Sequence, residues 1–255
     1  MYDGSAWVTP DVRYYTGTGW TTKVPQVQMW DGNGWQGSSP TARAFPVFAG
    51  SNSREYAGPR YVSLPVPQEA RVMDFVVSVC ANRSTIPQLV HPALRTLPQT
   101  YTYTEDGVYF SAAAFPYLGT DDGPVIWDLG ERAKQGVVIN MVYRYGDVTN
   151  RSVTPVSAGW TFRNVSEIPL MPAKKHTSIF AAVVFAKDFS SFRWPEGVTP
   201  REARKATFGK VGISIVTADT SRVGASPGNL LLNTKTPLAG LYLITIPGRD
   251  EARPT

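Results

Sequence analysis

The first 40 residues repeat one short pattern three times, and this repeat limits what the chain can fold into. Each copy reads aromatic residue, polar turn residue, glycine, any residue, alanine or glycine, and then tryptophan, at residues 2–7, 15–20 and 30–35. Glycine supplies the positive φ angle of a tight hairpin turn, and the aromatic residues at both ends can pair across the strands. Each copy therefore predicts a short β-hairpin. The aromatic residues that end the copies are Tyr2, Trp7, Tyr15, Trp20, Trp30 and Trp35.

An isolated two-stranded hairpin is only marginally stable in water. Three repeated hairpins must therefore stack on one another, on a partner chain or on a neighbouring domain. Their tryptophans also offer the large rigid faces that contact sugar rings and protein interfaces. For Trp7, Trp20 and Trp35 we favour packing, within the stack or between subunits, over ligand binding. Residues 1–40 are thus predicted to be an assembly or docking region.

The rest of the chain, residues 41–247, is predicted to be a jelly-roll-like β-sandwich, which makes the whole protein all-β. Short apolar stretches alternate with clusters of turn-forming residues, no helical period separates them, and 12% of the chain is aromatic. The predicted strands lie at residues 60–66, 72–81, 107–111, 125–128, 137–145, 160–162, 177–186, 211–217 and 241–246. The polar residues 248–255 are predicted to form a loose tail.

Some local patterns make sharper predictions. Residues 137–145 and 72–79 alternate in the way that is typical of half-buried strands with one core face. Residues 179–185 are apolar on both faces, which indicates a central strand covered on each side. Residues 199–202 (Thr-Pro-Arg-Glu) predict one or two helical turns, because they combine a capping threonine, proline at the first helical position and glutamate three residues after the cap.

The composition argues against several classes of function. The net charge of +5 is scattered without a basic run, which does not favour a nucleic-acid partner. No apolar run approaches the length of a membrane span and no secretion signal begins the chain, so we expect a protein made in the cytosol. The single cysteine, Cys80, lies in an apolar run and is expected to be buried as a small hydrophobic residue.

Catalysis is not predicted, and neither a cofactor nor a bound metal is expected. His91 and His176 are the only histidines, and both sequence contexts favour structural roles. No serine-nucleophile motif and no phosphate-binding glycine loop occurs.

Acidic residues between positions 105 and 131 raise one catalytic alternative. A glycan hydrolase needs two facing carboxylates, but most of these residues lie in sequences that are typical of turns. A calcium ion in the loop of Asp121 and Asp122 stays open as a further alternative. The acidic residues are Glu105, Asp106, Asp121, Asp122, Asp128 and Glu131.

The chain resembles minor tail proteins of siphophages that infect actinobacteria. Residues 29–35 (Met-Trp-Asp-Gly-Asn-Gly-Trp) resemble the opening segments of those proteins. Residues 66–79, 158–162 and 179–185 resemble their β-sandwich domains, in which a strand that leaves a turn is followed by a Gly-Trp segment and an apolar strand. Family members are often longer and carry collagen-like or further repeats, which this chain does not contain. The resemblance implies no catalytic residues.

This resemblance implies a virion structural protein at the phage tail or tail tip that is synthesised in the host cytoplasm. Its implied partners are other phage tail proteins and copies of itself in a trimer or ring, with contact to host cell-wall glycan as a further expectation. Two other interpretations stay open. The chain can instead be a free carbohydrate-binding module that uses its tryptophan row as the platform for cell-wall glycan, or, as the least favoured interpretation, a glycan hydrolase.

Overall fold

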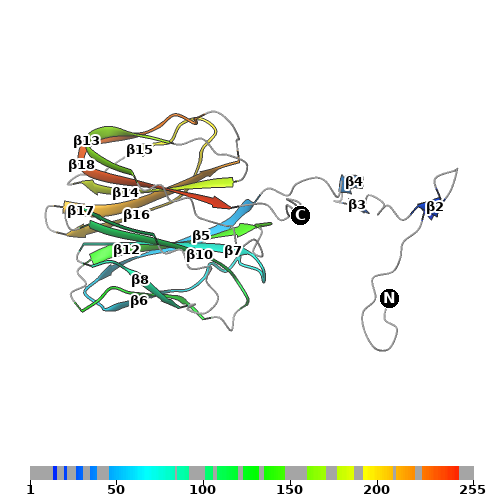
Figure 1. The fold of residues 1–255 in the computed structure, drawn as a ribbon, viewed down its shortest axis with the longest axis horizontal. Coiled ribbons are helices and arrows are strands. Elements are labelled where there is room, and N and C mark those ends of the chain that lie inside the picture. Colours follow the sequence, from blue (N-terminus) through cyan, green and yellow to red (C-terminus); the bar gives the residue numbers. More distant parts are fainter. Residues whose placement is uncertain are drawn as a thin grey trace. The chain divides into compact units, whose positions relative to one another are not determined.

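The computed structural model describes most of the chain, and all of the secondary structure in the described residues is β (Figure 1). This confirms the predicted all-β class. The chain divides into two compact units, Met1–Arg43 and Ala44–Thr255. The described residues are 14–15, 20–21, 27–30, 35–38, 46–83, 85–91, 101–105, 108–119, 123–131, 135–146, 160–170, 177–186, 192–208, 211–221 and 226–246.

The N-terminal unit contains two of the predicted hairpins. Strand β1 (Tyr14–Tyr15) pairs with β2 (Trp20–Thr21), and β3 (Val27–Trp30) pairs with β4 (Trp35–Ser38), both antiparallel. The repeated pattern therefore forms hairpins in its second and third copies. The first copy, with Tyr2 and Trp7, lies outside the described residues.

The described residues of the second unit form three antiparallel sheets, one of five strands, one of three and one of six. The central sheet has the order β5 (Val47–Ala57), β12 (Gln135–Arg144), β7 (Phe75–Asn82), β10 (Val108–Pro116), β9 (Tyr101–Glu105). The small sheet has the order β6 (Tyr61–Leu64), β11 (Val125–Asp128), β8 (Gln88–His91). The large sheet has the order β13 (Trp160–Pro169), β18 (Asn229–Ile246), β14 (Thr177–Ala186), β17 (Val211–Thr220), β16 (Thr199–Phe208), and β15 (Phe192–Arg193) pairs with β18.

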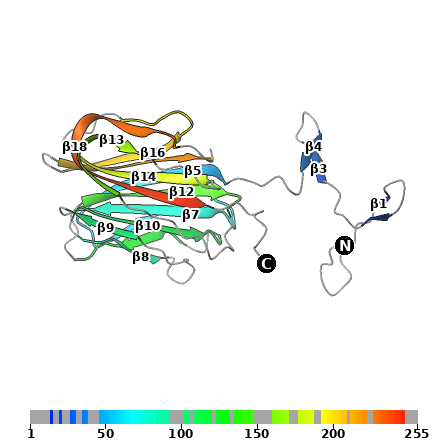
Figure 2. The same ribbon diagram turned by 45° about the horizontal axis from the view of Figure 1, so that its top comes forward.

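The central sheet is covered on both faces (Figures 1 and 2). Phe75 and Ile139 on one face pack with residues of the large sheet such as Ile213. Val138 on the opposite face packs with Trp127 of the small sheet. The large sheet also curls, so that its strands enclose a third apolar cluster, formed by Ile168, Leu170, Phe180, Trp194, Val198, Val216, Ala218, Leu230, Leu232, Ala239, Leu241 and Leu243. The sandwich therefore has three stacked sheets.

The prediction that residues 137–145 and 72–79 form half-buried strands is wrong. Every residue of β7 is buried, and so is every residue of β12 except Arg144. The polar residues that suggested a solvent face bond to the small sheet instead, since Ser78 Oγ accepts a hydrogen bond from Trp127 Nε1 at 3.0 Å and Asn140 Nδ2 donates to the Leu64 carbonyl at 3.2 Å. Buried polar groups with hydrogen-bond partners thus produced an alternation that resembles amphipathicity.

Strand β14 contains residues 179–185, which the sequence predicts to be a central strand, and the structure confirms this position. It lies between β17 and β18 in the large sheet. Its neighbouring residues Ile179 and Phe180 are both fully buried, one in the cluster shared with the central sheet and the other in the cluster inside the curl. Both faces of β14 are therefore covered at these two residues.

The predicted helical turn at residues 199–202 is wrong, because these residues begin strand β16. Thr199 pairs with Asp219 of β17, and the register shifts between Pro200 and Glu202. Proline lacks the backbone N–H that a ladder needs, and it is tolerated at an edge strand or at a bulge. Strand β16 is such an edge, so the pairing with β17 overrides a local sequence that would suit a helix start.

Cys80 is fully buried, as the sequence predicts. Its sulfur lies 3.5 Å from the Tyr56 hydroxyl, and burial raises the pKa of the thiol from 9.0 to about 12. The unfolded thiol ionises above about pH 9, whereas the folded thiol keeps its proton, so the unfolded state binds fewer protons in this window. The stability that Cys80 contributes is therefore complete below about pH 9 and is lost as the pH rises towards 12.

We expect native Cys80 at pH 8 to react with a thiol reagent only as fast as the protein unfolds. We also expect the free energy of unfolding to fall more steeply above pH 9 in the natural protein than in Cys80→Ala. Denaturant titrations at pH 8 and pH 10 measure this difference. Modification of the folded protein within seconds would contradict the burial of this thiol.

Candidate functional site

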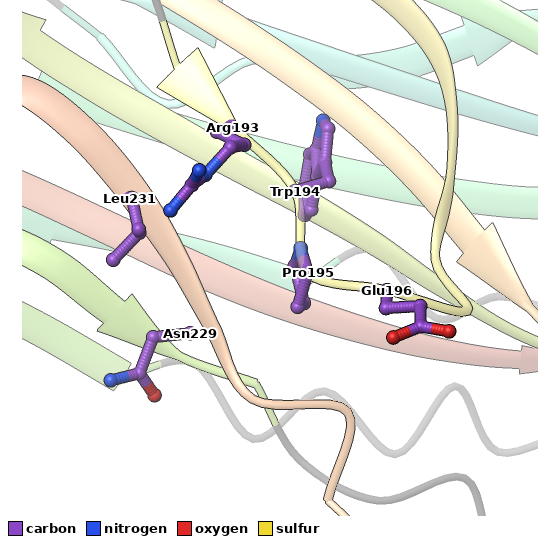
Figure 3. A pocket seen from close by; sticks show the side chains of 6 residues that line it. All are labelled: Arg193, Trp194, Pro195, Glu196, Asn229 and Leu231. Carbon is purple, nitrogen blue, oxygen red and sulfur yellow. The ribbon is translucent and has the colours of Figure 1, made fainter.

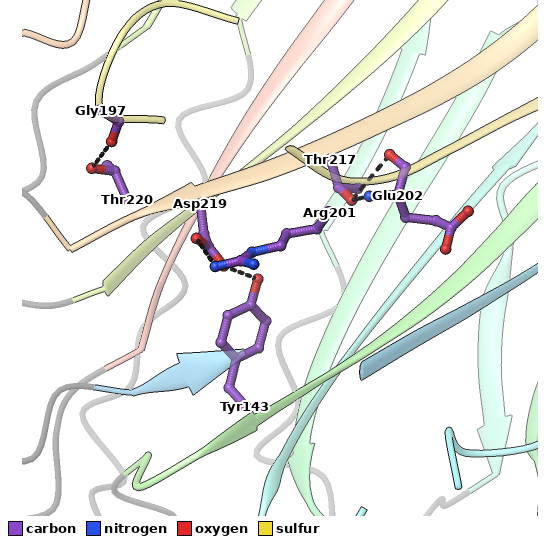
Figure 4. A network of polar contacts seen from close by, with 7 residues as sticks. All are labelled: Tyr143, Gly197, Arg201, Glu202, Thr217, Asp219 and Thr220. Carbon is purple, nitrogen blue, oxygen red and sulfur yellow. Dashed lines mark hydrogen bonds and ion pairs between the residues drawn. The ribbon is translucent and has the colours of Figure 1, made fainter. Parts of the chain in front are cut away.

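A polar network joins the central sheet to the large sheet (Figure 4). The Asp219 carboxylate on β17 accepts hydrogen bonds from Arg201 Nε at 2.7 Å and Arg201 Nη2 at 2.9 Å. It also accepts a bond from the Tyr143 hydroxyl on β12 at 2.8 Å. The Arg201 guanidinium lies over the Phe48 ring, 4.5 Å from its centroid, and the Phe48 ring meets the Tyr143 ring edge-on at 5.6 Å. We call Tyr143, Arg201 and Asp219 the inter-sheet clamp.

Burial keeps the Tyr143 hydroxyl of the inter-sheet clamp in its protonated state. Tyr143 is fully buried, and its pKa is raised well above the ordinary range, first by burial and then by the charge of Asp219. The hydroxyl therefore stays protonated and keeps donating to Asp219. A two-bond arginine–carboxylate pair is also stronger and more directional than a single neutral bond. The pair holds Asp219 in place within the large sheet, and the bond from Tyr143 then links this carboxylate to the central sheet.

A second set of contacts continues along the same edges. Glu202 Oε2 on β16 accepts a bond from Ser51 Oγ at 2.8 Å, and Glu202 Oε1 accepts one from Ser53 Oγ at 3.2 Å. Further along, Arg204 Nη2 lies 3.7 Å from Glu55 Oε1. Strands β5 and β16, the edge strands of two different sheets, are therefore joined by side chains along their length.

A pocket of about 380 Å³ opens beside strand β15 (Figure 3). Arg193 and Leu231 are cross-strand partners in β15 and β18, so their side chains are neighbours on one face. Asn229, two residues earlier on β18, donates from Nδ2 to Glu167 Oε2 at 3.0 Å. The lining residues are Arg193, Trp194, Pro195, Glu196, Asn229 and Leu231.

The structure pairs four of the six aromatic residues that the repeats singled out. Tyr15 lies opposite Trp20 across the first described hairpin, and Trp30 lies opposite Trp35 across the second. Tyr2 and Trp7 lie outside the described residues.

The acidic residues between 105 and 131 are only partly described. Glu105 lies opposite Val108 in the β9–β10 hairpin, and Asp128 is paired with Arg60, whose Nη2 donates to Oδ2 at 3.1 Å. The hydrogen bond from Arg60 lowers the pKa of Asp128, and a bond from the backbone of Gly130 adds to this effect. Asp106, Asp121 and Asp122 lie outside the described residues, and so does His176, so the alternative of a calcium ion in the loop of Asp121 and Asp122 stays open.

His91 ends strand β8, and its Nδ1 lies 2.9 Å from the Pro124 carbonyl oxygen. In the part of the chain that the structure describes, no three His, Cys, Asp or Glu side chains come together closely enough to hold a metal ion. The same part contains no helix that is long and apolar enough to cross a membrane.

The sequence did not point to the clamp or to the pocket. Arg201 and Asp219 are 18 residues apart and come together only through the β16–β17 register. The pocket brings residues 193–196 together with residues 229–231. One local signal was present, because Trp194-Pro195-Glu196-Gly197 places an aromatic residue directly before a turn sequence, as in the N-terminal repeats.

The sequence matches no known protein-family model, and no curated protein and no solved structure shows significant similarity to the chain.

Proposed function

We propose that this protein is a non-enzymatic structural component of a bacteriophage tail, in which the N-terminal hairpins bind neighbouring subunits. The observation that carries the proposal is the pairing of Tyr15 with Trp20 and of Trp30 with Trp35 across two very short hairpins. Strands of two and four residues bury too little surface to be stable alone. Tyrosine and tryptophan residues at these opposed positions supply the large apolar area that is typical of the core of a protein interface.

The second unit suits the role of a rigid body that such hairpins would tie into an assembly. The inter-sheet clamp and the β5–β16 contacts join the central sheet to the large sheet, and the bond from Trp127 to Ser78 joins the small sheet to the central sheet, so a load applied to one sheet would be carried by the others. In this proposal the protein is made in the host cytoplasm and becomes part of the virion tail. Its partners are other tail proteins and copies of itself, and its exposed loops are available for contact with the host surface.

The oligomeric state of the full chain tests the role of the hairpins. We expect the natural protein to form an oligomer in light scattering coupled to size-exclusion chromatography. The double variant Trp20→Ala/Trp35→Ala is expected to be monomeric, because it removes one ring from each aromatic pair. The matched control Thr21→Ala/Gln36→Ala changes the adjacent positions of the same strands and should keep the natural oligomer. A monomeric natural protein, or an oligomer that survives loss of both tryptophans, would refute the proposed role.

Electron microscopy tests the assignment to a tail. Particles that carry a tagged copy of this chain, decorated with gold-labelled antibody, are expected to show the label on the tail. Label on the capsid, or particles from which the chain is absent, would overturn the tail assignment even if the hairpins assemble subunits.

A further inference from the structure

We propose that the pocket beside strand β15 is a binding site for an uncharged, hydroxyl-rich ligand of the size of one or two sugar rings. Its volume of about 380 Å³ lies towards the small end of the range of small-molecule sites, which is roughly 300–1,000 Å³. The proposal does not depend on the assembly role of the hairpins, because every lining residue belongs to the second unit.

The walls of the pocket are held by packing and by backbone bonds. Pro195 begins a turn that the Val198 N–H closes onto the Pro195 carbonyl at 3.3 Å. Gly228, with a φ of 103°, lies so close that an added Cβ would meet Pro195 Cβ at 3.3 Å. The turn and the start of β18 are therefore in close contact, so the pocket is present before any ligand arrives. Preorganisation of this kind lowers the entropic cost of binding.

Trp194 anchors the pocket to the core. Its side chain is buried within the cluster inside the curled sheet, where its ring centroid lies 6.5 Å from that of Phe180 and 6.3 Å from that of Phe192. Arg193 and Pro195, on either side of Trp194, line the pocket together with it (Figure 3). Because Trp194 is fixed by its aromatic neighbours, the residues beside it are held in position as well.

The polar groups of the lining carry both signs of charge. Arg193 supplies guanidinium donors, Glu196 supplies carboxylate acceptors, and Asn229 has an amide oriented by its bond to Glu167. A hydroxyl group both donates and accepts hydrogen bonds, so a polyol satisfies both kinds of partner. An anionic ligand in the pocket would be repelled by the Glu196 carboxylate, and a cationic ligand would be repelled by the Arg193 guanidinium.

The apolar part of the lining fits the same class of ligand. Pro195 and Leu231 offer aliphatic surface between the polar groups. A sugar ring has hydroxyl groups around its rim and C–H groups on its faces, which is the same combination of polar and apolar surface. Because Arg193 and Glu196 are exposed and hydrated before binding, we expect a weak single-ring complex with a Kd on the order of 1 mM.

Ligand-observed saturation-transfer NMR with the full chain tests the proposal. The probes are the methyl glycosides of glucose, galactose and N-acetylglucosamine, each titrated to about 20 mM so that a millimolar site is filled. Glucuronate serves as the anionic comparison and cyclohexanol as the apolar one. We expect saturable transfer to at least one neutral glycoside, and weaker transfer to both comparison compounds.

Variants locate the binding. Arg193→Met and Glu196→Gln are each expected to raise the Kd at least fivefold, whereas Arg54→Met and Glu131→Gln change exposed residues outside the pocket and should leave it unchanged. All four positions are exposed, so thermal melts should match the natural protein and confirm that the variants fold. No transfer to any neutral glycoside, stronger transfer to glucuronate, or binding that survives both pocket substitutions would overturn the proposal.

Discussion

Replacing Gly136 with alanine is expected to destabilise the protein more than the same change at the other described glycines, because the closest approach to an added Cβ is found here. Gly136 lies in β12 opposite Asn82 of β7 and opposite Tyr56 of β5. A Cβ at this position would overlap the backbone carbonyl oxygen of Ala81 and the hydroxyl of Tyr56, which bond to each other at 2.8 Å. A backbone atom in the middle of a sheet cannot move away cheaply, so the strands must separate locally.

We expect Gly136→Ala to lower the free energy of unfolding by about 3 kcal/mol or more, at the upper end of the cost of overpacking a core. For a domain of this size the melting temperature would fall by roughly 6–12 °C, at about 2–4 °C per kcal/mol. Chemical denaturation and thermal melts of the full chain measure both quantities.

Gly50→Ala is the matched control, because the three atoms nearest to a Cβ there all belong to the flexible Glu69 side chain and not to backbone. We expect this variant to stay within about 1 kcal/mol of the natural protein. Tyr56→Phe should not rescue Gly136→Ala, since the Ala81 carbonyl still blocks the added methyl group. Equal melting temperatures for the two alanine variants would mean that the close approach of the strands at Gly136 is not real.

The positions of the strands could be predicted where hydrophobic residues dominate. Each of the nine stretches singled out in the second unit overlaps a strand, from β6 to β18. The number of stacked sheets could not be predicted. Alternation of polar and apolar residues along a strand shows that one face is polar, but it does not show whether that face contacts solvent or another sheet. In β12 the polar residue Asn140 bonds to the small sheet, and nothing local distinguishes it from a solvent-facing asparagine.

The edge strands were missed for a related reason. Strand β5 (Val47–Ala57) contains Ser51, Ser53 and Glu55 and has only one buried residue, Tyr56. Its polar side chains bond to Glu202 and Arg204 of β16, another polar edge strand, which the sequence predicted to begin as a helix. Hydrophobic periodicity cannot detect a strand whose partners are polar and more than 140 residues away.

The two candidate sites differ in what the sequence could reveal. The hairpin aromatics follow from a local repeat, so the pairs Tyr15–Trp20 and Trp30–Trp35 could be predicted from spacing alone. The pocket depends on the register of β15 against β18, which places Arg193 beside Leu231. Register between distant strands is set by the whole fold, and for this reason the pocket residues were not singled out.

The second large effect is expected from Asp219→Ala, which removes the acceptor of three hydrogen bonds in the inter-sheet clamp. The substitution leaves the Tyr143 hydroxyl fully buried and the Arg201 guanidinium only partly exposed, at 24% of its side-chain surface. Removing one partner of a largely buried pair typically costs about 3–5 kcal/mol, because the remaining charge loses its compensation. We expect a fall in melting temperature of roughly 6–20 °C by the same conversion.

A double-mutant cycle separates this mechanism from a simple loss of packing. If the cost arises from an uncompensated cation, then Asp219→Ala should be much less destabilising in an Arg201→Met background, because the methionine keeps aliphatic contact with Phe48 without a charge.

The exposed pair of Arg60 and Asp128 has the same chemistry and is the control. Asp128→Ala should lower the melting temperature far less than Asp219→Ala does, because solvent screens the charge of Arg60. Additive effects of Asp219→Ala and Arg201→Met would show that the two side chains stabilise the sheets independently. A strong coupling would instead show that Arg201 and Asp219, which pair within the large sheet, act as one unit, the unit that Tyr143 and Phe48 of the central sheet contact.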